Sequence, residues 1–303
     1  MRQYSQNIMI DGAASTNIGG GRIFTPDPTQ AQHYETQVAS VLDNIRGCLC
    51  GQILIREVMG GGLGKNVRIV PTPDADSRSV PGDQNAASPY NKPLRFPGDL
   101  PNTPQVERAG QIRTGTDGAA VLGTGTGSNT TIQYHPLLWL TETFRTGRIG
   151  NVMPDDVLFH ELVHALRMMS GMVEPMDMGN ADHTARFGNT EEFYAVMITN
   201  IYLSERNAKE NRGQALRGNV GPIEQFQPLT GQEAQSKMFY ERYKPSIRRL
   251  CREMIGFTHG GGVKGLKDVA APFNPIRECE QESEDLRQKY YGGLGLPDFP
   301  ASR

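Results

Sequence analysis

Apolar residues recur at every third or fourth position in four parts of the chain, a spacing that predicts helices. These parts are residues 30–59, 154–170, 190–208 and 231–255. Gly51 interrupts the first predicted helix, and Pro245 is expected to kink or split the last, because proline cannot donate an intrahelical hydrogen bond. The helix over 154–170 has apolar side chains around most of its circumference, so we expect it to be buried.

Short apolar runs between these helices predict strands. Residues 65–70 and 131–135 alternate between apolar and polar side chains, as a strand with one buried face does. The apolar bursts at 8–10 and 22–24 are spaced to pair as a small hairpin. Few short strands beside several helices indicate an α+β fold.

Glycine and proline are abundant, with 35 Gly and 20 Pro in 303 residues, and they predict where the ordered core is interrupted. Residues 1–30 are polar and Gly-rich, so we expect a flexible N-terminal arm. The Gly/Pro-rich stretch at about 71–121 reads as a long insertion without catalytic residues, and residues 258–303 as a polar C-terminal tail. A single folded domain is therefore expected over residues 31–257.

Charge and composition exclude several classes of function. The 31 basic and 33 acidic residues give a net charge of −2, which does not favour a nucleic-acid partner. The sequence has neither the long apolar run of a transmembrane helix nor a signal peptide for Sec export, so we expect no membrane partner. Four scattered cysteines predict reduced thiols rather than a disulfide framework.

The strongest chemical signal is the motif His160-Glu161-Leu-Val-His164, which lies in the helix predicted over 154–170. Two histidines four residues apart share one helix face, so both imidazoles can bind one metal ion. Neutral imidazoles suit Zn²⁺, and a site with two histidines, one further protein ligand and a water keeps a position open for catalysis. In this motif Glu161 stays off the metal and accepts the proton of the water.

The identity of the third metal ligand stays open on these grounds. Ser170 stands where the metzincin pattern requires a histidine, which excludes that class. Asp182 and His183 lie in a loop that could reach the ion. Glu191 and Glu192 are better placed, because they begin the next predicted helix and a carboxylate from a second packed helix completes a gluzincin site. One of the two could bind zinc while the other faces solvent or bonds a ligating histidine.

Peptide hydrolysis also needs a donor for the oxyanion and a surface for the substrate. The candidate donors follow the motif in the chain and are Tyr194, Tyr202, Arg212, Arg217, Tyr240, Tyr243, Arg186 and His183. We expect the strand over 131–135 to form the sheet edge that pairs with an extended peptide.

The region around the motif resembles known zinc peptidases. Glu192-Phe-Tyr-Ala195 resembles the third-ligand segment of anthrax lethal factor, and the Glu191-Glu192 pair resembles that of botulinum neurotoxin light chains. A closer resemblance is to the NleD-like type III effector zinc metallopeptidases, and it covers roughly residues 32–70 and 122–217. The features that carry it, in chain order, are Val41–Ile45, Gly51–Ile55, Gly125–Pro136, Phe159–Ala165, the Glu-Glu pair and Glu210-Asn211-Arg212.

These resemblances imply a zincin-like α+β metallopeptidase with a small mixed sheet and an H-E-x-x-H active-site helix. They imply one Zn²⁺ ion held by His160, His164 and a glutamate. The lethal-factor resemblance favours Glu192, whereas the neurotoxin resemblance keeps Glu191 as a rival. The neurotoxin-like pattern also favours Arg217 and Tyr243 as oxyanion donors.

The implied function is a zinc endopeptidase of bacterial effector or toxin type. Its expected partner is a protein substrate in the target cell, such as a host signalling protein, and a secretion chaperone would be a second partner. We expect export by a non-Sec, type III-like route and action in the host cytoplasm, or otherwise a cytoplasmic location. Two alternatives remain: a peptidase toxin domain of a polymorphic secretion system that acts on bacterial targets, and a non-catalytic zinc-binding interaction protein.

Overall fold

A mixed five-stranded sheet brings together the N-terminal strands and strands from later parts of the chain. The strand order is β1 (Arg2–Ser5), β2 (Ile8–Ile10), β5 (Val67–Pro71), β7 (Thr130–Tyr134) and β6 (Arg78–Pro81). The inner pairs β2–β5 and β5–β7 are parallel, whereas the outer pairs β1–β2 and β6–β7 are antiparallel. The strands predicted at 65–70 and 131–135 are therefore confirmed, and they are neighbours in this sheet.

The computed structural model describes residues 1–18, 21–60, 64–73, 77–94, 114, 116, 119–137, 152–174, 187–212, 216–217 and 232–291. The chain divides into two compact units, Met1–Phe226 and Gln227–Arg303. Among the described residues, no single helix has the length and hydropathy of a membrane span. One pair, Pro28–Ile45 with Leu49–Gly60, meets the criteria by length and composition but is bent by 119°.

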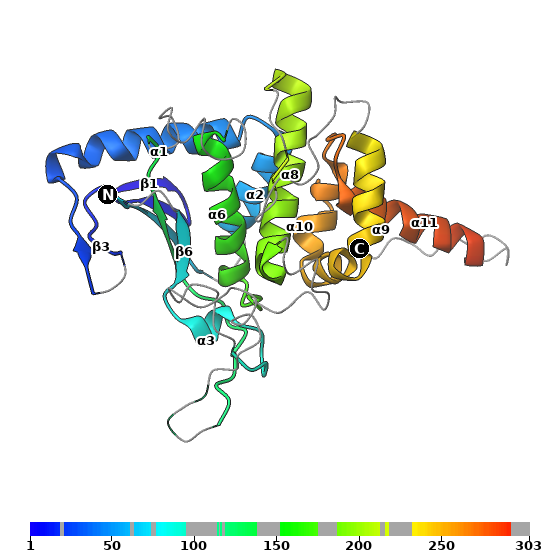
Figure 1. Ribbon diagram of the computed structural model, residues 1–303, viewed down its shortest axis with the longest axis horizontal. Coiled ribbons are helices and arrows are strands. Elements are labelled where there is room, and N and C mark those ends of the chain that lie inside the picture. Colours follow the sequence, from blue (N-terminus) through cyan, green and yellow to red (C-terminus); the bar gives the residue numbers. More distant parts are fainter. Residues whose placement is uncertain are drawn as a thin grey trace. The chain divides into compact units, whose positions relative to one another are not determined.

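Helix α6 (Pro154–Met169) is the central element of the N-terminal unit (Figure 1). It contacts strands β6 and β7 of the sheet, and it also contacts α1 (Ala31–Ile45), α2 (Leu49–Gly60) and α8 (Thr190–Glu210). These bounds confirm the helices predicted over 154–170 and 190–208. The predicted α+β fold with a small mixed sheet is confirmed as well.

Both ends of α6 are fixed by local chemistry. Pro154 occupies the first turn, where no backbone N–H is needed, and the Asp156 carboxylate accepts a hydrogen bond from the Met153 backbone N–H at 2.9 Å. At the other end Gly171 follows with a φ of 66°, in the left-handed region that glycine adopts without strain. The helix therefore begins and ends where the sequence predicts.

The N-terminal residues take part in the sheet, and the predicted hairpin between 8–10 and 22–24 is wrong. Strand β2 pairs with β1 and β5, whereas β4 (Ile23–Phe24) pairs with β3 (Thr16–Asn17). Parallel pairing with β5 buries Ile8 and Ile10 completely, which a two-stranded hairpin could not do. The domain boundaries given above, including a flexible arm over 1–30, stay a prediction.

Gly51 does not break the first helical region, contrary to the prediction. The break lies at residues 46–48, and Gly51 sits inside α2. A Cβ atom at this position would lie 1.7 Å from the Ile45 carbonyl oxygen. Glycine is required because the end of α1 passes directly over α2, not because the helix stops.

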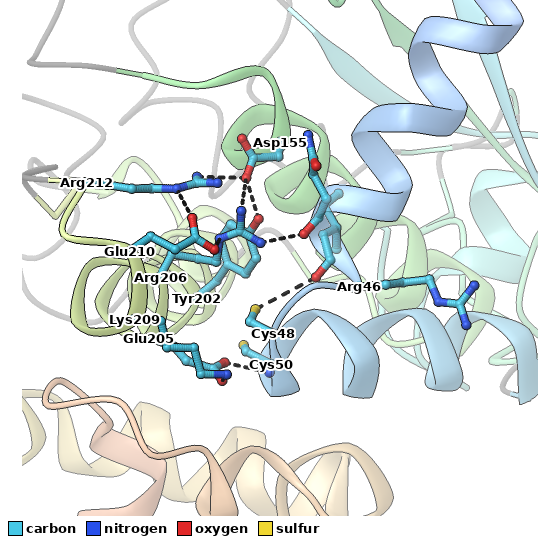
Figure 2. A network of polar contacts seen from close by, with 12 residues as sticks. Arg46, Cys48, Cys50, Asp155, Tyr202, Glu205, Arg206, Lys209, Glu210 and Arg212 are labelled. Atoms are coloured by element: carbon cyan, nitrogen blue, oxygen red, sulfur yellow. Dashed lines mark hydrogen bonds and ion pairs between the residues drawn. The ribbon is translucent and has the colours of Figure 1, made fainter.

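A polar network joins the start of α6 to the end of α8 (Figure 2). The Asp155 carboxylate, which is 3% exposed, accepts hydrogen bonds from the Tyr202 hydroxyl at 2.5 Å and from the Arg212 guanidinium at 2.8 Å. Arg212 also donates to Glu210 at 2.6 Å. A buried carboxylate costs free energy unless it is paired in this way, so the network holds the two helices in one register.

The same face of α8 holds the turn between α1 and α2 (Figure 2). The Arg206 guanidinium donates to the Asn44 carbonyl at 2.5 Å. The Glu205 carboxylate accepts the backbone N–H groups of Leu49 and Cys50 at 2.9 and 2.8 Å, so it caps the first turn of α2 from another helix.

The C-terminal unit is helical in its described part. It contains α9 (Gln232–Glu253), α10 (Ile255–His259), the short helix η4 (Leu266–Asp268) and α11 (Pro275–Tyr291). The kink predicted in the helix over 231–255 is confirmed. It lies at Tyr243, two residues before Pro245, where the backbone leaves the helical region with a φ of −113° and a ψ of 17°.

The close contact at Gly51 gives a stability prediction. Gly51→Ala should lower the free energy of unfolding by at least about 1–3 kcal/mol, because the new methyl group overlaps backbone atoms that cannot move independently. Urea denaturation followed by circular dichroism measures the change. Gly60→Ala, at the end of the same helix, has no atom within 4 Å of its Cβ and should be neutral or slightly stabilising. Equal effects of the two substitutions would contradict the role assigned to Gly51.

Candidate metal centre

Only two residues of α6 are not buried, and they are His160 and His164. Their side chains are 16% and 12% exposed, respectively. Because they are four residues apart, they lie on one face of the helix, and their Nε2 atoms are 3.2 Å apart. The two imidazoles are thus the partly exposed side chains of a helix that is otherwise buried.

Glu192 of α8 completes a triangle with the two histidines. Its carboxylate oxygens lie 3.4 Å from His160 Nε2 and 3.3 Å from His164 Nε2. Nitrogen and oxygen ligands at about 2.0–2.1 Å from a tetrahedral metal ion are about 3.3–3.4 Å from one another, so the three donors have the spacing that such an ion requires. Among the described residues, His160, His164 and Glu192 form the cluster that could hold a metal ion.

The first turn of α8 presents Glu192 to the histidines. Asn189 caps the helix, with its side-chain oxygen accepting the Glu192 backbone N–H at 2.9 Å. This hydrogen bond fixes the backbone of the residue that carries the carboxylate. Two acidic residues in the first turn also suit the positive end of the helix dipole.

Glu191 has a different partner, although it is the next residue in the chain. Its two oxygens accept hydrogen bonds from the Arg167 guanidinium at 2.6 and 2.7 Å, and one of them also accepts the Glu174 backbone N–H at 2.9 Å. Arg167 stacks on the Tyr194 ring at 4.7 Å. Glu191 is therefore committed to an ion pair between α6 and α8, and the structure does not bring it into the metal cluster.

Of the remaining ligand candidates, Asp182 and His183 lie outside the described residues, as does the oxyanion candidate Arg186. Their roles stay predictions.

The electrostatics of the cluster favour a positive charge at its centre. Burial alone would lower the pKa of His164, but the adjacent Glu192 carboxylate more than offsets this and raises it to about 9. Burial acts to raise the pKa of Glu192, yet the two histidines hold it far below its usual range. The metal-free triangle is thus an imidazolium–carboxylate pair at neutral pH.

Glu161, the central acid of the motif, lies beside this triangle and is 6% exposed. Burial raises the pKa of its carboxyl, and the neighbouring histidines and a hydrogen bond from Ser79 oppose that effect. The Ser79 hydroxyl lies 2.8 Å from Glu161 Oε2. No pattern in the sequence predicts a role for Ser79, because it belongs to the stretch expected to be an insertion without catalytic residues.

Arg217 lies at the N-terminal end of the histidine face of α6. Its guanidinium is 3.3 Å from the Asp156 carboxylate, and Asp156 precedes His160 by four residues. Its backbone is held by Asn200, whose side-chain oxygen accepts the Arg217 N–H at 2.6 Å. This places Arg217 one helical turn from the cluster, on the same side of the helix.

The other candidate donors have partners of their own. Tyr202 and Arg212 bond Asp155, Tyr194 stacks on Arg167, and in the C-terminal unit Tyr240 bonds Glu282. Tyr243 belongs to that unit too, at the kink of α9, with its ring 4.6 Å from that of Phe239. Its role as an oxyanion donor stays a prediction.

The expected substrate edge is wrong. Strand β7, which contains most of residues 131–135, pairs with β5 on one side and with β6 on the other. Strand β6 is an edge strand of the sheet, and it contacts α6 as β7 does. The sequence pattern could not reveal this, because β6 has four residues, is at most half-buried and ends in proline.

The Arg167–Glu191 pair predicts a large stability effect. Arg167→Met leaves the Glu191 carboxylate buried without its partner and should lower the free energy of unfolding by about 3–5 kcal/mol. Urea denaturation measures it. The matched control is Arg56→Met, because Arg56 pairs with Glu57 at 2.7 Å in a more exposed setting and its loss should cost less than about 1 kcal/mol. Similar losses in both variants would refute the importance given to the buried pair.

Comparison with known proteins places this geometry in a family. A model of the Peptidase M91 family, described as an effector protein, matches residues 26–218, which is more than half of the chain. A search of curated proteins finds no match. The matched range includes α6, α8, the three strands β5, β6 and β7, and all three residues of the candidate metal cluster. The chain therefore belongs to the Peptidase M91 family of effector proteins, as its resemblance to the NleD-like peptidases predicts, and it is a metalloendopeptidase.

Proposed function

We propose that the protein is a zinc endopeptidase of bacterial effector type, which hydrolyses a peptide bond in a protein of the target host cell. The observation that carries this proposal is the triangle of His160, His164 and Glu192 with its donor spacing of 3.2–3.4 Å, next to the Glu161 carboxylate. Membership of a peptidase family supports the reaction, and the description of that family as effectors supports a host target.

The donor set suits one Zn²⁺ ion. Two imidazole nitrogens and one carboxylate oxygen are the protein ligands of catalytic zinc sites that keep a fourth position open. When bound there, zinc polarises the substrate carbonyl and lowers the pKa of a water to about 7. Glu192 is our choice for the third ligand, because Glu191 is engaged by Arg167.

Glu161 is proposed as the general base and acid. It accepts the proton of the attacking water and returns that proton to the amine that leaves when the peptide bond breaks. Its burial supports this role, because the raised pKa of the carboxyl brings its proton affinity closer to that required at neutral pH. The Glu161 side chain is itself enclosed, and its carboxylate accepts a hydrogen bond from Ser79 at 2.8 Å, which supports a fixed position during the reaction.

Arg217 and Tyr243 are proposed as donors to the oxyanion. For Arg217 the support is its position on the histidine side of α6, where Asp156 orients its guanidinium. Asp156 leaves that guanidinium with further N–H groups, since arginine has five donors. For Tyr243 the support is the family resemblance alone.

The description of the family as effectors supports action in a host cell. We propose export by a non-Sec route of type III kind, action in the host cytoplasm, and a secretion chaperone as a partner before export. The identity of the substrate is open to experiment.

Five variants test the site. His160→Ala with His164→Ala should abolish zinc binding and cleavage. Glu161→Gln should keep near-stoichiometric zinc, measured by elemental analysis, and lose about a thousandfold or more in rate.

Glu192→Ala should lose most zinc, whereas Arg217→Ala and Tyr243→Phe should keep zinc and lose rate. Cleavage is read by proteome-wide labelling of new N-termini in a host-cell lysate. Full cleavage by Glu161→Gln would rule out the mechanism, and retained zinc in Glu192→Ala would rule out that ligand.

Zinc binding should release about one proton at pH 7. His164, with its pKa raised to about 9, is protonated in the metal-free protein and must lose that proton to bind the ion. Raising the pH from 7 toward 9 should therefore strengthen apparent zinc affinity by about tenfold per unit, and the gain should level off above 9. Isothermal titration calorimetry in buffers of different ionisation enthalpy measures the release.

Glu192→Gln is the control for this titration, because it keeps an oxygen at the same position and removes the charge that raises the pKa of His164. It should release fewer protons at pH 7. Proton release near zero in the wild-type protein would contradict the assigned charge state.

A further inference from the structure

The side chain of Ser79 joins the edge of the sheet to the H-E-x-x-H helix. Its hydroxyl lies 2.8 Å from Glu161 Oε2 and 2.9 Å from the main-chain carbonyl oxygen of the same residue. The two residues are 82 positions apart in the chain. This contact is therefore a product of the tertiary fold and not of local geometry.

Strand pairing fixes where the Ser79 hydroxyl sits. Ser79 lies inside β6 and is paired with Ile132 of β7, which is completely buried. The strand packs against α6. Since the backbone of Ser79 is held by the sheet, its short side chain offers the hydroxyl to Glu161 at a nearly constant position.

The contact distinguishes the two oxygens of the Glu161 carboxylate. Oε2 is hydrogen-bonded to Ser79, whereas Oε1 has no donor among the described residues. A glutamate side chain on a helix can rotate about three bonds, and one anchored oxygen removes most of that freedom. The unanchored oxygen is then the one left to take the proton of a water.

The Ser79 hydroxyl can serve both states of the base. With Glu161 ionised, the hydroxyl donates to Oε2, and when Oε1 carries the proton taken from water, the hydroxyl still donates to Oε2 or turns to the main-chain carbonyl. Ser79 itself neither gains nor loses a proton in the reaction. It acts through Glu161 and does not touch the reacting atoms.

We propose that Ser79 is a positioning residue that anchors Glu161 Oε2 and so aims Oε1 at the attacking water. The proposal rests on the proposed function, in which Glu161 is the general base. It assigns a role in the reaction to a segment between β5 and β7 that carries no sequence motif.

Ser79→Ala and Ser79→Thr separate this role from a structural one. Loss of a hydrogen bond to a charged group should lower kcat by about tenfold or more, with KM within about twofold of wild type and zinc content unchanged. Threonine keeps the hydroxyl and should restore kcat to within a few-fold of wild type. The substrate is a synthetic peptide that spans a bond identified by the N-terminal labelling experiment.

Ser77→Ala is the matched control. Ser77 lies two residues earlier, and its buried Oγ has no hydrogen-bond partner among the described residues, so removal of this hydroxyl should leave kcat unchanged. A readout independent of activity is a double-mutant cycle of the urea midpoint with Ser79→Ala and Glu161→Gln. The two substitutions should be non-additive if the side chains interact.

The outcomes divide as follows. A wild type that cleaves no peptide faster than Glu161→Gln overturns the proposed function and this inference with it. A wild type that cleaves while Ser79→Ala keeps full kcat overturns this inference alone. Equal losses in Ser79→Ala and Ser79→Thr, reduced zinc in Ser79→Ala, or an additive cycle also overturn it.

Discussion

The buried ion pair between Arg167 and Glu191 determines how α8 lies against α6. Both side chains are almost fully enclosed, at 1% and 7% exposure, so neither charge can turn to solvent if the helices shift. The carboxylate meets the guanidinium only when the first turn of α8 lies beside the C-terminal half of α6. Successive residues on a helix point about 100° apart, so Glu192 is then directed to the two histidines of α6. The metal triangle depends on this pair.

Much of this arrangement follows from local patterns in the sequence. The apolar spacing identifies α6 and α8, and the His160–His164 spacing identifies a metal-binding face, because one helical turn is enough to bring both imidazoles together. Local patterns could not decide between Glu191 and Glu192. Both begin the same helix, and what separates them is Arg167, whose position in a buried helix could be known only after the two helices were packed together.

The features that the sequence pattern does not predict all depend on contacts between separate helices or strands. Ser79 reaches Glu161 through an edge strand of four residues, too short for an alternating pattern to be read. Ile8 and Ile10 belong to β2, which pairs with β5 in parallel. No turn sequence predicts a pairing of this kind. Gly51 reads as a helix breaker, although its role is to let the Ile45 carbonyl approach α2. In each case the deciding neighbour belongs to another helix or strand, so propensity alone gives the wrong answer or none.

The burial of α6 has a consequence for how mutational tolerance in this protein should be interpreted. Every residue of the helix except His160 and His164 is enclosed, which includes the general base proposed at Glu161. Substitutions along the whole helix will therefore impair function through loss of folded protein as well as through loss of chemistry. A map of the positions at which substitutions abolish function would therefore include the whole helix, and it would not distinguish the catalytic residues within it. The two histidines are the exception, since intolerance at a partly exposed position reports what the side chain binds.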